Sequence, residues 1–353
     1  MAEKVLMKGN EALAEAAIMA GCRHYFGYPI TPQTEVAAYM AKRMPKIGGT
    51  FLQAESEIAA INMVIGVAST GKRAMTSSSS PGISLKSEGI SYLAGCDLPA
   101  LIVNVQRGGP GLGGIQPSQS DYFQATRGAG HGDFHLIVLA PASVQEMVEL
   151  VFRGFDLGEK YRMPVMLLSD GTMGQMMEPV VLEQKEIVQY DKSWALTGTD
   201  GVRKPNIVNS LFLKPEELEK FNFARYERSK KIEETEAMYE EYKMEDAEIC
   251  VVAFGVASRV SKNAIDEARA MGIKAGMIRP ITLWPFPKKA LLKASEKVKK
   301  FISVELSMGQ MIEDISLAVK CRREVLLCNR TGGMIPTTAE VVAKIKEACG
   351  GAE

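Results

Sequence analysis

The sequence has no excess of charge of either sign, since 42 lysine and arginine residues balance 42 aspartate and glutamate residues. A nucleic acid or an anionic membrane selects for a basic surface, so neither is expected as a partner. Long apolar runs are also missing, because none approaches the roughly 18 residues that cross a bilayer. The opening stretch, MAEKVLMKGNEALAEAA, has acidic residues where a signal peptide has its apolar core. We therefore expect a cytoplasmic protein.

Closely spaced cysteines are absent too. Iron–sulfur clusters and zinc sites usually need tight ligand spacing, and no C-x-x-C pair occurs here. The three histidines form no metal-ligand triad; His131 and His135 bracket GDF in a glycine-containing loop, where a structural and a functional role both stay open. We expect no metal on this chain and six reduced structural thiols, which are Cys22, Cys96, Cys250, Cys321, Cys328 and Cys349.

What is present is an alternation of short apolar strands with helical patterns. ALIVNVQR, HLIVLAP and MPVMLLSD are near-continuous apolar runs, which are typical of parallel strands buried on both faces. The pattern predicts an open α/β domain over residues 1–188, whose ligands would lie beyond the carboxyl ends of the strands. A charged connector, predicted over 189–245, includes a helix that we expect to run from Pro215 to Asp246. A second α/β domain is predicted over 246–353, with Ser258 as the N-cap of its first helix.

One motif partly matches the pattern of a nucleotide-binding loop. GVASTGKR, at residues 66–73, matches G-x-x-x-x-G-K, but Arg73 occupies the position that needs serine or threonine for magnesium. The stretch also follows a helical pattern and precedes a strand, which is the reverse of a phosphate loop. We interpret Gly71 as the glycine that closes the helix, with Lys72 at its negative end.

Two turns that follow strands offer groups for an organic acid. Arg107, in QRGGPGLGG, could grip a carboxylate through two parallel hydrogen bonds, or clamp loop carbonyls. Thr31, in GYPITP, could donate its hydroxyl to a ligand, or serve only as the N-cap of a helix with Pro32 at its first position.

A carboxylate at the entrance of a buried helix is the most unusual feature. Glu55 and Glu57 precede the apolar run from Ile58 to Val67 and point to nearly opposite sides of the helix. Glu57 shares the stripe of Ile61 and Val64, so it is expected to be buried. Proteins tolerate a buried carboxylate mostly at functional sites, although a capping role is the simpler alternative.

Several segments together resemble a known family. YPITPQTE, ESEIAAINMVIGVASTGKRAMTSSSSPG, VQRGGPG, PVMLLSD and RPITLWPFP are similar to the α subunit of the 2-oxoacid:ferredoxin oxidoreductases, over a span from Leu6 to about Gly333. The opening VLMKGNEALAEAAIMAGC looks most like the 2-oxoisovalerate, or branched-chain, type, and the 2-oxoglutarate type is the near neighbour.

The resemblance implies a pyrimidine-binding-type domain of thiamine-diphosphate enzymes followed by a transketolase C-terminal-like domain. The implied activity is oxidative decarboxylation of a 2-oxo acid with CoA, giving acyl-CoA, CO2 and reduced ferredoxin. The family's cofactor-activating glutamate falls on Glu57, its substrate threonine on Thr31 and its substrate arginine on Arg107. Pro29 and Ile30 are implied as further cofactor contacts.

The resemblance also implies partner subunits. A β subunit would bind the diphosphate and Mg2+, because G-D-G followed about 25 residues later by Asn-Asn is missing here. A γ subunit and a ferredoxin-like subunit would accompany it, and the iron–sulfur clusters would lie on partners. A subunit that keeps the fold for assembly alone is the alternative of another class.

Overall fold

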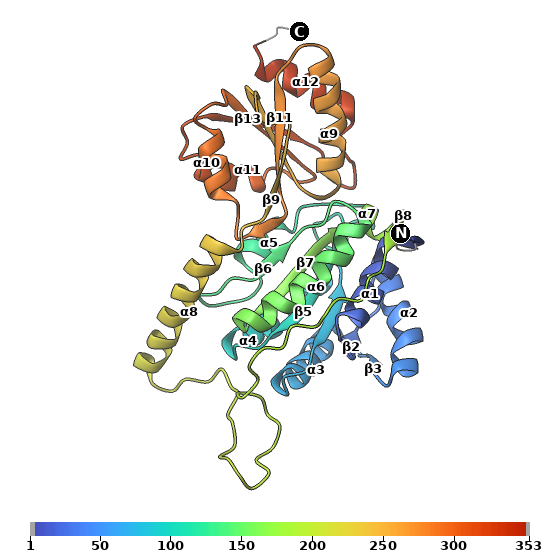
Figure 1. Ribbon diagram of the computed structural model, residues 1–353, viewed down its shortest axis with the longest axis vertical. Helices are drawn as coiled ribbons and strands as arrows, with labels where there is room; N and C mark the ends of the chain where they lie inside the picture. Colours follow the sequence, from blue (N-terminus) through green and yellow to red (C-terminus); the bar gives the residue numbers. More distant parts are fainter. Residues whose placement is uncertain (1–3, 351–353) are drawn as a thin grey trace.

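In the computed structural model the chain is described from residue 4 to residue 350, as a larger α/β unit, a smaller α/β unit and a long connection between them (Figure 1). The larger unit is built on a seven-stranded sheet with the order β12-β6-β7-β5-β4-β2-β3. Six strands are parallel, and only β12 at the edge runs antiparallel, to β6. The strands are β2 (His24–Gly27), β3 (Thr50–Gln53), β4 (Ala74–Ser78), β5 (Ala100–Gln106), β6 (Ile137–Leu139), β7 (Pro164–Asp170) and β12 (Thr282–Trp284).

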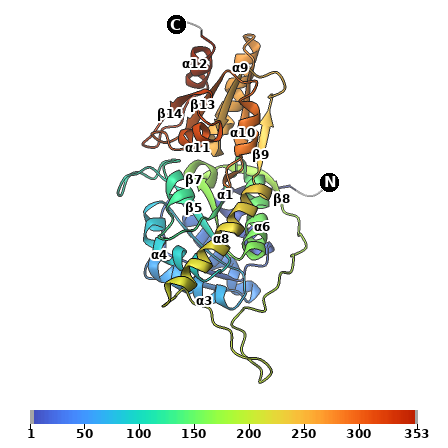
Figure 2. The same ribbon diagram turned by 90° about the vertical axis from the view of Figure 1, so that its left-hand side faces the viewer.

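Helices cover both faces of this sheet (Figures 1 and 2). On one face α1 (Gly9–Met19) packs against α2 (Thr34–Arg43) and α6 (Val144–Tyr161), and on the other α3 (Glu57–Ser69) packs against α4 (Pro81–Gly95). Strand β5 has seven residues, all buried, as expected for a strand covered from both sides. Shorter elements complete the unit: the 3-10 helix η1 (Met44–Ile47), α5 (Tyr122–Arg127), α7 (Gly171–Gln175) and the antiparallel pair β1 (Lys4–Lys8) and β8 (Met177–Val181).

The smaller unit has a five-stranded sheet with the order β14-β13-β10-β11-β9. Three of its four strand pairings are parallel, and β9 at the edge runs antiparallel to β11. The strands are β9 (Tyr239–Tyr242), β10 (Ile249–Ala253), β11 (Ala275–Pro280), β13 (Lys300–Glu305) and β14 (Glu324–Asn329), and the helices are α9 (Gly255–Ala270), α10 (Lys288–Ala294), α11 (Met311–Ala318) and α12 (Thr338–Ala348).

The connection is irregular until α8 (Pro215–Thr235), which lies along the larger unit (Figure 2). The prediction of a helix from Pro215 to Asp246 is therefore wrong at its C-terminal end, because α8 stops at Thr235. The helix stops because Glu236 is buried between the charged ends of Arg153 and Lys160, at 2.5 and 2.6 Å. The chain then continues as β9, which pairs with β11.

The two units contact each other through main-chain and side-chain hydrogen bonds. Gln119, in the larger unit, accepts from Leu306 N at 3.0 Å and donates to Phe254 O at 2.9 Å, and both of these residues lie in the smaller unit. Strand β12, beyond residue 246, completes the sheet of the larger unit, whereas β9, before it, belongs to the smaller sheet. The domain boundaries at 188 and 246 stay a proposal.

The start of α9 also differs from expectation. Ser258 is not its N-cap, because the helix begins at Gly255, whose φ of 54° lets the chain turn directly out of β10. Ser258 lies inside the first turn, where its hydroxyl donates to Gly255 O at 2.7 Å. Within residues 4–350, all six cysteines are free thiols and no helix is long and apolar enough to cross a membrane.

Candidate active site at the carboxyl edge of the larger sheet

The carboxylate of Glu57 lies buried at the first turn of α3. Ser56 caps this helix by accepting a hydrogen bond from Ala59 N at 3.2 Å. Glu57 is 5% exposed, whereas Glu55 is exposed, so the prediction that Glu57 is the buried member of the pair is confirmed. A Cβ on Gly82 would lie 2.6 Å from Glu57 Oε1, so the carboxylate fits against α4 because residue 82 has no side chain.

The serine run beside Glu57 supplies buried hydroxyls without partners. A Cβ on Gly82 would lie 2.0 Å from Ser78 Oγ, which places this hydroxyl and the Glu57 carboxylate against the same glycine. Within the described part of the chain, the hydroxyls of Ser78 and Ser79 form no hydrogen bond although both side chains are fully buried. Leaving a buried hydroxyl unsatisfied is unfavourable by about 1–3 kcal/mol. A polar ligand at this edge would remove that penalty.

Ser80 continues the run toward β5 and is held in an unusual conformation, with φ of 27°. Its Oγ donates to Asp121 Oδ2 at 2.6 Å and accepts from Arg107 N at 3.0 Å. Asn104 supports the same group, because its Nδ2 donates to Asp121 Oδ2 at 2.9 Å and its Oδ1 accepts from Ser80 N at 3.1 Å. Burial raises the pKa of Asp121, and the hydrogen bonds from Ser80 and Asn104 oppose this rise. The sequence interpretation missed Asn104 and Asp121.

The structure brings Arg107 and Thr31 together. Arg107 is 7% exposed, and its Nη1 donates to Thr31 O at 3.0 Å while its Nη2 donates to Leu112 O at 3.1 Å. Arg107 therefore clamps loop carbonyls, which is one of the two roles expected for it from the sequence. Within residues 4–350, Arg107 Nε has no hydrogen-bond partner, so the guanidinium still has one buried N–H to offer.

The turn that carries Thr31 is anchored by Gln33 rather than by a threonine cap. The side chain of Gln33 accepts from Ser77 Oγ at 2.5 Å and donates to Tyr28 O at 3.3 Å. Helix α2 begins only at Thr34, so the prediction of Thr31 as N-cap and Pro32 as first helical residue is wrong. This anchoring leaves the Thr31 side chain exposed at the carboxyl edge of β2. Two neighbours share the turn, namely Pro29, which is exposed, and Ile30, which is half-buried.

Lys86 is a second charged group at the site that the sequence interpretation missed. Its side chain is 0% exposed, and its Nζ donates to the main-chain oxygen of Glu57 at 3.2 Å. Burial lowers the pKa of Lys86 to about 8, and the nearby charge of Glu57 opposes this shift. The helical spacing could have revealed it, because the buried stripe of α4 includes Gly82, Ile83, Lys86, Gly89 and Ile90.

The structure also places the glycine-lysine motif and the loop histidines. Helix α3 ends at Ser69, Gly71 has a φ of 76° and β4 begins at Ala74, so GVASTGKR closes a helix as predicted. Arg73 is buried and pairs with Glu159 at 2.7 Å. Of the two loop histidines, His135 stacks on Trp284 at 4.7 Å between ring centres, and His131 is exposed.

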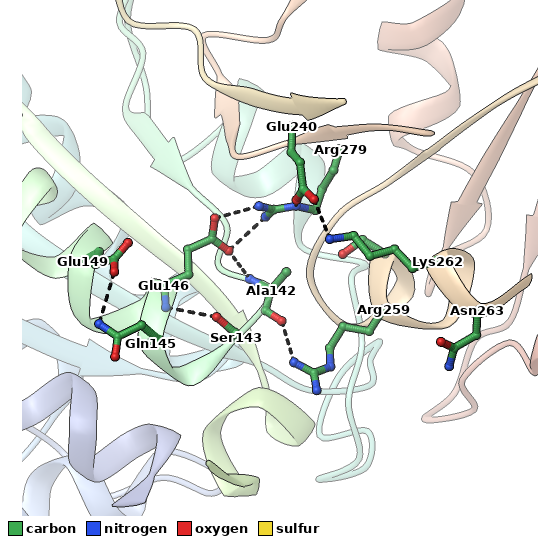
Figure 3. A pocket seen from close by; sticks show the side chains of 11 residues that line it. Ala142, Ser143, Gln145, Glu146, Glu149, Glu240, Arg259, Lys262, Asn263 and Arg279 are labelled. Carbon is green, nitrogen blue, oxygen red and sulfur yellow. Dashed lines mark hydrogen bonds and ion pairs between the residues drawn. The ribbon is translucent and has the colours of Figure 1, made fainter. Parts of the chain in front are cut away.

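A separate pocket of about 520 Å³ lies between α6 and α9, and Figure 3 shows Arg279 between Glu146 and Glu240 on its wall, with Lys262 beside Glu240. Arg279 makes two hydrogen bonds to Glu146, at 2.8 and 2.9 Å, and one to Glu240 at 2.7 Å. Lys262 also pairs with Glu240, at 2.5 Å, while Arg259 pairs with Glu178 at 2.9 Å. All three cations are therefore paired with carboxylates, Arg259 and Arg279 across the two units and Lys262 within the smaller one, so the pocket leaves none of them free for a ligand.

Two family models match almost the whole chain. The pyruvate flavodoxin/ferredoxin oxidoreductase thiamine-diphosphate-binding model matches residues 15–246, and the pyruvate:ferredoxin oxidoreductase core domain II model matches residues 247–341. Ketoisovalerate oxidoreductase subunit VorB of Methanothermobacter marburgensis is 51% identical over 346 residues, covering 98% of both chains. The 2-oxoglutarate synthase subunit KorA of the same organism is 37% identical over 376 residues, covering 98% of this chain and 99% of KorA.

Two solved structures support the same family and fold. The 2-oxoglutarate:ferredoxin oxidoreductase of Magnetococcus marinus, with 2-oxoglutarate, coenzyme A and succinyl-CoA bound, superposes with a TM-score of 0.87 at 29% identity. The match covers 98% of this chain and 65% of that one. A split-gene transketolase in an inactive β4 tetramer shares the fold, with a TM-score of 0.61 at 13% identity over 97% of this chain and 98% of its own. The predicted fold class is therefore confirmed, and the chain belongs to the family of 2-oxoacid:ferredoxin oxidoreductase subunits.

Proposed function

We propose that this chain is the α subunit of a thiamine-diphosphate-dependent 2-oxoacid:ferredoxin oxidoreductase and that 2-oxoisovalerate is its substrate. The buried Glu57 carboxylate carries the proposal, because it lies beside the buried hydroxyl of Ser78, which has no hydrogen-bond partner in the described chain. The higher identity to the ketoisovalerate subunit than to the 2-oxoglutarate subunit favours the branched-chain acid. 2-Oxoglutarate is the alternative substrate.

The residues present fit the aminopyrimidine half of thiamine diphosphate. Glu57 would hold the proton shared with the pyrimidine N1′, and Ser78 and Ser79 would give polar contacts at the same edge. Pro29 and Ile30 would flank the ring from the turn after β2. When bound, the cofactor supplies the electron sink for decarboxylation.

Thr31 and Arg107 would hold the 2-oxo acid. The exposed Thr31 hydroxyl and the unpartnered Arg107 Nε can each donate one hydrogen bond, and the hydrogen bond from Arg107 to Thr31 O fixes their separation. An acid held by two donors whose separation is fixed loses freedom before it reacts, which is a major source of rate enhancement.

A partner must complete the site. We propose a β subunit that brings the diphosphate and Mg2+, with a γ subunit and a ferredoxin-like subunit that carry iron–sulfur clusters and contact CoA and ferredoxin. The subunit names of the relatives support a complex of several chains. The cytoplasmic location stays a prediction.

The test is 2-oxo-acid-dependent reduction of a viologen dye by the complex recovered through a tag on this chain. The panel is 2-oxoisovalerate, 2-oxoglutarate, pyruvate and an aromatic 2-oxo acid, with CoA and thiamine diphosphate added. We expect reduction with 2-oxoisovalerate, and a loss of about a hundredfold or more in Glu57→Gln while the complex still assembles. If an intact, cluster-bearing complex reduces the dye with none of the acids, the chain is an assembly subunit instead.

A further inference from the structure

Two successive turns of α4 contact one residue, Glu57. Gly82 and Lys86 are four residues apart, so they lie on the same face of the helix. Gly82 leaves the space that receives the Glu57 carboxylate. One turn later, Lys86 Nζ donates to the Glu57 main-chain oxygen at 3.2 Å. The Glu57 carboxylate therefore lies beside Gly82, and the Glu57 main-chain oxygen accepts a hydrogen bond from the buried Lys86 ammonium.

The surroundings single out Glu57 as the charge that Lys86 balances. Helix α3 has Glu57 as its sole titratable side chain. Elsewhere on α4, Tyr92 OH donates to Glu88 at 3.0 Å on the exposed face. The titratable groups of α4 and of the segments that contact it, apart from Glu57 and Lys86, include Glu88, Tyr92, His131 and Asp170. The N-terminal end of α4 also contacts the segments of Arg107 and Asp121 through Ser80, and α5, which carries Tyr122 and Arg127, through Ser84. His131 is exposed, and Asp170 is occupied as the N-cap of α7.

We propose that Lys86 is a positioning residue for Glu57: its buried ammonium holds the Glu57 main chain and supplies a positive charge near the carboxylate. The inference rests on the proposed function, in which Glu57 contacts the cofactor. A buried ammonium is unfavourable, and a similar apolar side chain in its place is often neutral or stabilising. A purely structural role would therefore be served better by methionine. Burial lowers the pKa of Lys86 to about 8, so its charge is present at neutral pH and is lost in mildly alkaline solution.

The experiment measures how fast bound thiamine diphosphate exchanges its C2 proton for deuterium, which requires no substrate and no electron transfer. The complex is assembled with wild type, Lys86→Met and Lys86→Arg, and the exchange is stopped with acid and read by NMR between pH 6 and 9.5. Lys72→Met is the matched control, because Lys72 is exposed at the far end of α3. The Kd of the cofactor is measured alongside, so that weaker binding is separated from slower exchange.

We expect the wild-type rate, relative to free cofactor at the same pH, to fall as the pH rises through about 8. Lys86→Met should be slower by about tenfold or more at pH 7 and should lack this alkaline fall. Lys86→Arg should keep its rate above pH 8, because the guanidinium stays charged. If Lys86→Arg fails to assemble, the pH profile of Lys86→Met decides alone.

A Lys86→Met complex with the wild-type rate and the wild-type alkaline fall would overturn the inference. The proposed function is tested separately by Glu57→Gln in the same assay. If wild type and Glu57→Gln exchange at the same rate, the proposed function fails and the role of Lys86 fails with it. If Glu57→Gln alone is slow, the inference about Lys86 is overturned and the proposed function survives.

Discussion

Lys86 should make the stability of the folded chain depend on pH in a way that one substitution removes. Its pKa falls from 10.5, the ordinary value, to about 8 in the folded state because the side chain is buried. This lowering of the pKa corresponds to about 3 kcal/mol of destabilisation of the charged native state. The perturbation is Lys86→Met, which keeps the length of the side chain and removes the charge.

The direction in which stability changes with pH follows from the number of protons bound to the folded and to the unfolded chain. Below pH 8 the folded and unfolded chains both carry the proton on Lys86, and the full penalty of about 3 kcal/mol applies. Between about pH 8 and 10.5 the folded chain has lost the proton while the unfolded chain keeps it, so the stability of wild type rises with pH. Methionine has no such penalty at any pH, but it loses the hydrogen bond to Glu57 O, worth about 1 kcal/mol. The variant should therefore be more stable by about 2 kcal/mol at pH 7, and this advantage should vanish by pH 10.

The assay is urea unfolding of the full chain, wild type against Lys86→Met, at pH 7, 8, 9 and 10. Only the change of their difference with pH is interpreted, because effects of packing and of the other titrating groups cancel in it. Lys72→Met, which removes an exposed lysine, should show a constant difference from wild type. A difference for Lys86→Met that stays constant from pH 7 to 10 would refute the reasoning, whatever its size.

Three further substitutions test neighbouring parts of the site. Gly82→Ala should destabilise the chain by about 1–3 kcal/mol in urea unfolding, because the new Cβ would lie 2.0 Å from Ser78 Oγ. It should also weaken cofactor binding measured by calorimetry. Wild-type values in both measurements would contradict the packing described. Arg107→Lys should raise the KM for the 2-oxo acid about tenfold or more. An ammonium cannot span the carbonyls of Thr31 and Leu112 and still donate a third hydrogen bond to the substrate. An unchanged KM would mean that Arg107 only clamps the loop. Burial raises the pKa of Asp170 from 3.8 to about 6, so wild type should lose about 3 kcal/mol relative to Asp170→Asn as the pH rises from about 3 to 7. Parallel stability curves for the two would contradict this shift.

The larger fold could be predicted because its strands carry a strong local pattern. The apolar runs ending at Arg107 and Asp170 became the buried parallel strands β5 and β7. Glu57 was chosen over Glu55 by helical geometry alone, which depends on no tertiary contact. Where a local pattern decides the structure, the sequence was sufficient.

The failures occur where tertiary contacts overrule the local pattern. The stretch after Thr235 is rich in charged residues that suit a helix, yet Tyr239–Tyr242 becomes β9 because β11 offers a free edge. Thr31 before proline is typical of a helix start, but the hydrogen bond from Ser77 to the buried side chain of Gln33 delays the helix by two residues. Ser77 and Gln33 are 44 residues apart, so no local window contains this contact.

Three of the buried side chains without a hydrogen-bond partner in the described chain, those of Ser78, Ser79 and Arg107, lie at the edge of the sheet to which the family resemblance also points. Charges buried elsewhere in the described chain can be well satisfied: Glu305 accepts hydrogen bonds from Gln310 N at 2.8 Å and from Met311 N at 3.1 Å at the start of α11. Around Glu57, by contrast, Ser78 and Ser79 keep free buried hydroxyls and Lys86 keeps a buried charge. Each of these features makes the free chain less stable, and folding alone gives no reason to retain them together. They are explained at once if a ligand and a partner subunit complete the site.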